Sequence, residues 1–197
     1  MLGDYGLNDK NHPSNSKQFR ELIKHLSDYS HTGIHPSFGS NYKKDQLGKE
    51  IIRLREIVHK EVVLSRQHFG MLQFPNTYQK IVNLGITDDY SMGFPQFNGY
   101  RAGTSFVYKW FDLSKNLQTE LRIHPYAIND EAFGKETNYN LEEMHNKFQR
   151  YLHDTLELGG ELQIVFRSNS FSNNPKNKVY KDFLSYLVVE AQQISMR

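Results

Sequence analysis

The sequence predicts an α/β fold, a mainly parallel barrel or sheet, and two observations carry this prediction. Segments whose apolar residues recur with a 3.6-residue period alternate along the chain with short β-branched apolar runs. Several of these runs end in ionisable side chains, as strands do at the face of an α/β fold that carries function. The 197-residue chain is long enough for one sizeable core, so a single domain, 1–197, is expected.

The first helix is expected to follow Ser14 or Ser16, either of which can cap it, and to end near Tyr29. Its apolar residues fall on one stripe, which is predicted to pack on a sheet. A short strand then ends at His35, because Pro36 cannot continue it.

The same alternation continues to residue 90. An amphipathic crossover helix is expected over 43–60, with charged residues such as Glu50 largely off its apolar face, and a buried strand over 61–65. A third helix over 74–84 is followed by a strand end at 86–90 that carries carboxylates.

The second half contains one long loop. Residues 91–105 are rich in glycine and aromatic residues and too long for a plain connection, which makes the loop a functional candidate. The elements expected after it are strands over 106–113, 121–127 and 161–166 and helices over 140–158 and 179–188.

Composition excludes several classes of function. With 24 Lys and Arg against 22 Asp and Glu and no charge block, a nucleic-acid partner is not expected. The absence of cysteine restricts any metal to nitrogen and oxygen ligands. No signal peptide or membrane-spanning run is apparent, so the expectation is a soluble, cytoplasmic protein without a membrane partner.

Two histidines stand at the predicted strand ends. His35 follows one strand and His68 follows the next, so the two imidazoles are expected to meet on one rim and to form a metal site. For each of them a hydrogen-bonded structural role is the alternative.

Five segments, in order, carry a resemblance: Gly3-Asp4-Tyr5-Gly6, Gly33-Ile34-His35-Pro36-Ser37, Ser65-Arg66-Gln67-His68-Phe69, 85–93 and 100–104. This ordered set resembles a bacterial branch of the polysaccharide deacetylase family, the NodB-homology carbohydrate esterases. The resemblance implies a distorted (β/α) barrel in which a divalent metal, usually zinc, is held by an aspartate and two histidines. It implies hydrolysis of N-acetyl groups on amino sugars of a glycan, with a second aspartate as base and a histidine as general acid.

The chain departs from that pattern at three positions. The family's paired aspartates belong to a first strand that would precede Gly3, so the expected barrel lacks this strand. The family's second metal histidine, four residues after the first, is replaced by Gly39. Arg167 takes the place of the general acid, and a guanidinium does not transfer protons near neutral pH.

Other site residues are predicted from the resemblance and from their places at a strand end or in the long loop. Arg66 and Asp89 are predicted as catalytic residues, with Arg66 ordering a neighbouring carboxylate or making an ordinary salt bridge. Tyr100 and Arg101 are predicted to bind substrate, while packing of Arg101 on an aromatic ring is equally open.

Three further assignments are structural. Asp88 is expected to be solvated or to cap a helix, and His124 to be structural. The six remaining histidines are expected at the surface.

The sequence therefore leaves two functions open. The first is a metal-dependent deacetylase acting on a glycan; the alternative is a non-catalytic relic that binds carbohydrate or a protein partner. The missing strand leaves an open sheet edge, so a homodimer is expected in either case.

Overall fold

The computed structural model describes residues 1–196, which form a mixed α/β fold. The chain divides into two compact units, one made of Met1–Met92 and Val107–His124 and the other of Gly93–Phe106 and the residues from Pro125 onward. The first unit contains α1 (Lys17–Tyr29), α2 (Gln46–Val58), α3 (Asn76–Asn83), β1 (Leu64–Ser65), β2 (Asp88–Asp89), β3 (Tyr108–Asp112) and β4 (Leu117–Ile123). The second contains β5 (Ile128–Asn129), α4 (Asp130–Glu136), α5 (Leu141–Leu158), β6 (Ile164–Val165) and α6 (Lys178–Ser195).

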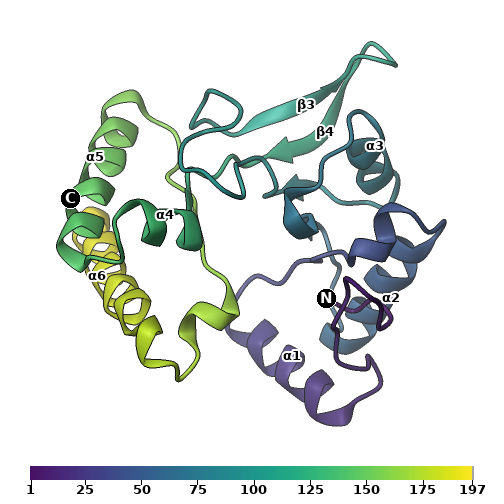
Figure 1. The fold of residues 1–197 in the computed structure, drawn as a ribbon. Coiled ribbons are helices and arrows are strands. Elements are labelled where there is room, and N and C mark those ends of the chain that lie inside the picture. Colours follow the sequence, from purple (N-terminus) through teal and green to yellow (C-terminus); the bar gives the residue numbers. More distant parts are fainter. Residues whose placement is uncertain (197) are drawn as a thin grey trace. The chain divides into compact units, whose positions relative to one another are not determined.

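The four-stranded sheet of the first unit has the order β1-β2-β4-β3, and Figure 1 labels its strands β3 and β4. β1, β2 and β4 are parallel, and β3 pairs with β4 as an antiparallel hairpin. The strand expected before His35 is reduced to one parallel bridge, in which the Ile34 N–H donates to the Leu64 carbonyl at 2.8 Å. The predicted mainly parallel α/β character is thus confirmed, and the described strands form no closed barrel.

Helix α2 supplies much of the core of this unit through Leu47, Ile51, Leu54, Ile57 and Val58, all buried. The prediction that Glu50 lies off the packed face is wrong, because Glu50 is fully buried. Its carboxylate accepts hydrogen bonds from the backbone N–H and hydroxyl of Ser37, in the loop after His35.

Helix α1 has the predicted N-cap but not the predicted packing. The Ser16 hydroxyl accepts the Phe19 N–H, which confirms Ser16 as the cap. The apolar stripe does not pack on a sheet, because Leu22 and Leu26 are 52% and 54% exposed. Only Ser27 is buried in α1, and Lys60, which follows α2, donates to the Ser27 carbonyl.

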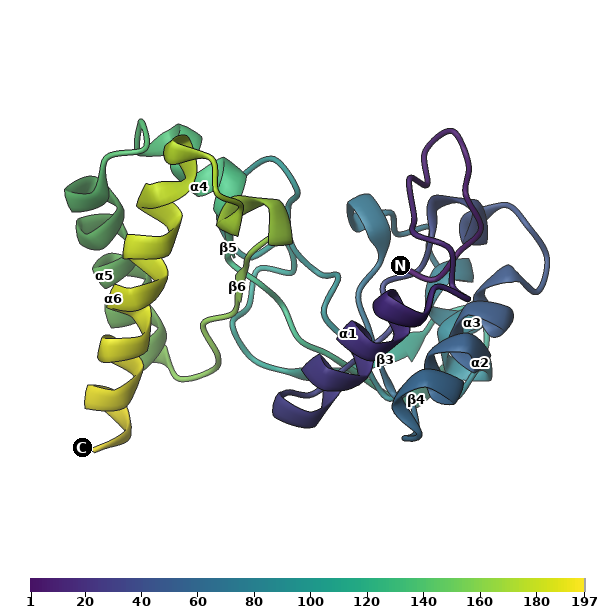
Figure 2. The ribbon, with the colours of Figure 1, turned by 90° about the horizontal axis from the view of Figure 1, so that it is seen from below.

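The second unit packs helices around a parallel pair of short strands, β5 and β6. Its core contains Ile128, Phe133, Met144, Phe148 and Phe183. Helices α5 and α6 lie side by side (Figure 2). Helix α4 and strand β5 were not predicted, because they are short and α4 begins with two carboxylates rather than an apolar repeat.

Within residues 1–196 no helix is both long and apolar enough to cross a bilayer. The prediction that the six remaining histidines are surface residues fails at His145, which is half-buried and stacks on Tyr186 with ring centroids 3.8 Å apart.

Candidate functional site

His35 and His68 meet in the first unit. His35 follows the Ile34 bridge, and His68 follows the neighbouring strand β1 by three residues. The Nε2 atom of His35 lies 3.0 Å from Nδ1 of His68, with the two rings perpendicular. The predicted convergence of the two imidazoles therefore occurs, because adjacent parallel strands end on the same side of the sheet.

The backbone fixes the orientation of the His35 ring. Its Nδ1 lies 2.6 Å from the Arg66 carbonyl oxygen, and a carbonyl only accepts, so Nδ1 carries the proton. The neutral ring then presents the lone pair of Nε2 to His68, whose Nδ1–H donates to it.

Burial keeps both rings neutral. Desolvation lowers the pKa of His35 to about 4, against the opposing effect of the hydrogen bond to the Arg66 carbonyl. Desolvation likewise lowers the pKa of His68. At neutral pH the pair consists of two uncharged imidazoles, which is the state that binds a metal.

Two buried carboxylates support the loop after His35. Asp9 accepts the N–H groups of Phe38 and Gly39 at 2.7 and 2.9 Å, and Glu50 binds Ser37. Neither was predicted as part of the site. The only sequence signal was the turn itself, whose backbone N–H groups need acceptors when they are buried.

The first unit lacks a complete metal-ligand set among the residues described. No group of three His, Asp or Glu side chains in residues 1–196 converges as metal ligands. The described site therefore consists of two histidines only.

The two aspartates of β2 have structural partners. Asp88 was expected to be solvated or a cap, and this is wrong: it is 3% exposed and pairs with Arg122 at 2.7 Å and with His124 at 2.7 Å. Burial alone would raise the pKa of Asp88, but the hydrogen bonds from Arg122, Thr87 and His124 lower it to about 2. His124 also stacks on Tyr90 at 4.4 Å, in agreement with its predicted structural role.

Asp89 is completely buried and accepts hydrogen bonds from Ser65 and Ser91, with Ser65 Oγ at 2.6 Å. Burial raises its pKa despite these bonds. Arg66, half-buried, contributes the carbonyl that orients His35. The catalytic roles predicted for Arg66 and Asp89 stay predictions.

Tyr100 and Arg101 lie in the second unit. The Tyr100 hydroxyl donates to the Glu161 carbonyl at 3.0 Å and lies 3.2 Å from Thr155 Oγ1, which fastens the loop to the end of α5. Arg101 is half-buried in the turn that Gly103 closes. Substrate binding by either residue stays a prediction.

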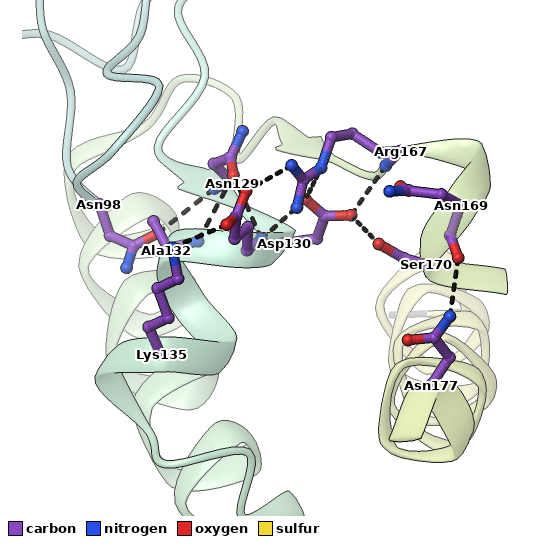
Figure 3. Close-up of polar contacts among 10 residues, drawn as sticks. Asn98, Asn129, Asp130, Ala132, Lys135, Arg167, Asn169, Ser170 and Asn177 are labelled. Carbon is purple, nitrogen blue, oxygen red and sulfur yellow. Dashed lines mark hydrogen bonds and ion pairs between the residues drawn. The ribbon is translucent and has the colours of Figure 1, made fainter. Parts of the chain in front are cut away.

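Arg167 follows β6 and is held by two carboxylates of α4 (Figure 3). Its backbone N–H and Nε donate to Asp130 at 2.8 and 3.2 Å, and its Nη1 contacts Glu131. Asp130 also accepts from Ser170 Oγ. Arg167 is thus part of an ion-pair network that joins β6 to α4.

No protein-family profile, curated protein or solved structure matches this chain.

Proposed function

We propose that His35 and His68 form a divalent-metal site, and that the chain is a polysaccharide deacetylase-like protein acting on N-acetyl groups of amino sugars in a glycan. The support is the ordered set of sequence segments that resembles this family together with the meeting of the two histidines. The finer fold belongs to the same proposal: a NodB-like distorted (β/α) barrel without its first strand.

The observation that carries the proposal is the hydrogen bond from His35 Nδ1 to the Arg66 carbonyl. Histidines that bind metals commonly donate their second ring N–H to such a carbonyl, which fixes the tautomer and aims the other nitrogen. His35 has this arrangement while Nε2 faces a second imidazole.

The spacing of the two nitrogens also suits a shared metal. Two nitrogen ligands of a tetrahedral zinc, each at about 2.0–2.1 Å, are separated by about 3.3 Å. His35 Nε2 and His68 Nδ1 are 3.0 Å apart, so a metal would replace the hydrogen bond between them once each ring turns its nitrogen lone pair towards the ion. His68 would then carry its proton on Nε2.

A bound zinc would supply an acidified water and polarise an acetyl carbonyl. Two residues of this chain would hold the metal: His35, whose ring the Arg66 carbonyl orients, and His68, which follows β1 by three residues. The described residues provide two of the three ligands that a catalytic zinc site normally has.

Zinc titration by calorimetry tests the metal site. We expect about one zinc per chain, and a loss of affinity of tenfold or more in His35→Ala and in His68→Ala. His153→Ala is the matched control, because His153 is an exposed histidine of α5. Absence of zinc binding, or an equal loss in all three variants, would contradict the proposal.

Acetate release from chitin oligosaccharides separates an enzyme from a relic. The second candidate is a non-catalytic protein that binds carbohydrate or a protein partner, and the observation in its favour is that Arg167, at the position of the family's general acid, is engaged in ion pairs. Zinc binding with acetate release supports the deacetylase, whereas glycan binding without release supports the relic. The expected homodimer is measured on the same samples by light scattering.

A further inference from the structure

The second unit contains a cavity of about 770 Å³, a volume typical of small-molecule sites. Polar and apolar atoms contribute about equally to its lining, which comes from the start of α4, the turn after α4, the segment after β6 and the start of α6. The lining residues that matter here are Glu131, Tyr139, Arg167, Asn169, Asn177 and Tyr180.

Glu131, which lines the cavity, and the neighbouring Asp130 already have hydrogen-bond partners. Asp130 accepts from Arg167 and from Ser170, and its two oxygens are both engaged. Glu131 binds Lys135 through Oε1 and Arg167 through Oε2. The two negative charges are balanced by the two cations, so the cluster of Asp130, Glu131, Lys135 and Arg167 carries no net charge.

Two hydrogen-bond donors at the cavity, in contrast, are available to a ligand. Tyr180 is only 5% exposed and lines the cavity, and its hydroxyl makes no hydrogen bond to any of the described side chains or backbone groups. Burial raises the pKa of Tyr180, so the hydroxyl stays protonated and can donate. The Nη2 atom of Arg167 is also without a partner in the described part of the chain, whereas its Nε and Nη1 are bound.

The first turn of α6 borders the same cavity. Asn177 precedes this 18-residue helix and Tyr180 lies in its first turn, and both line the cavity. No side chain caps this end of α6, and its first turn contains no acidic residue. The Asn177 amide instead donates to the Asn169 carbonyl (Figure 3). The positive end of the helix dipole therefore lies beside the Tyr180 hydroxyl, and no acidic residue of the first turn neutralises it.

We propose that this cavity binds a small molecule through an oxyanion, a carboxylate or a phosphate, held by Tyr180 and Arg167 at the start of α6. Donors without acceptors and an uncapped helix start favour a ligand that brings acceptor oxygens and negative charge. This proposal is independent of the histidine pair, because every residue in it belongs to the second unit.

The test is titration of the full chain with three probes, followed by NMR or calorimetry: inorganic phosphate, glucuronate and glucose. Glucuronate and glucose differ at the carboxylate, so the pair separates an anion site from a site for sugar hydroxyls. Binding of phosphate alone identifies a phosphate site, and binding of glucuronate without glucose identifies a carboxylate site. Equal binding of glucose and glucuronate, or binding of neither anion at about 10 mM, overturns the proposal.

Tyr180→Phe locates the bound anion. The substitution removes only a hydroxyl that has no partner in the free protein, so the melting temperature should not fall, while anion affinity should drop about tenfold. Tyr186→Phe is the control on the same helix, because the Tyr186 hydroxyl binds Gln149 and does not line the cavity. Unchanged affinity in Tyr180→Phe, or an equal loss in both variants, overturns the assignment.

Discussion

At the scale of single residues, polar side chains such as those of His35 and Asp88 are held mainly by contacts with residues distant in sequence. His35 is oriented by the carbonyl of Arg66, and Asp88 by Arg122 and His124. Neither contact can be read from local spacing. The sequence did predict that His35 and His68 meet, because both follow strands whose ends were expected on one rim of the fold.

Asp88 gives a prediction for stability against pH. Its pKa is about 2 in the folded chain and 3.8 as an isolated group, so the unfolded chain takes up the proton first as pH falls. The stabilisation is complete above about pH 4 and is lost as pH falls towards 2. Discounted for the exposure of Arg122, it amounts to about 1–2 kcal/mol.

Urea unfolding from pH 7 to pH 3 in the wild type and in Asp88→Asn measures this effect. The variant should be less stable at pH 7 and should lose less stability on acidification. An identical pH slope in both proteins would show that the Asp88 ion pairs do not contribute.

At the scale of elements, the longer helices and the places of most strands were predictable, whereas the ends of the strands were not. α2, α5 and α6 have clear apolar repeats and lie where they were expected. Four of the strands have only two residues, which is too short for an alternating pattern to define their ends. The exposure of the α1 stripe and the burial of Glu50 depend on tertiary packing, which periodicity alone does not contain.

Glu50 provides the test of how α2 supports the candidate site. The buried carboxylate satisfies Ser37 and Gln46, so Glu50→Ala should cost about 3 kcal/mol in the free energy of unfolding. Glu56→Ala, an exposed change in the same helix, should stay within about 0.5 kcal/mol. Chemical denaturation measures both, and equal effects would contradict a supporting role for Glu50.

At the scale of the whole molecule, the two compact units are interleaved in sequence. Residues 93–106 belong with the C-terminal segment, and 107–124 return to the N-terminal one. The glycine- and aromatic-rich loop 91–105 nearly coincides with the first of these segments, but its composition indicated function and not a domain boundary, so one domain, 1–197, was predicted. The histidine pair and the cavity lined by Arg167 and Tyr180 belong to different units and can be tested separately.

The proposed metal site depends most on the protonation state of His35 and His68. Long-range ¹H–¹⁵N NMR of the imidazoles, recorded without and with zinc, tests it directly. We predict that His35 carries its proton on Nδ1 in the free protein, and that zinc shifts the resonances of His35 Nε2 and His68 Nδ1 together. A proton on His35 Nε2 in the free protein, or zinc-insensitive resonances for both rings, would contradict it.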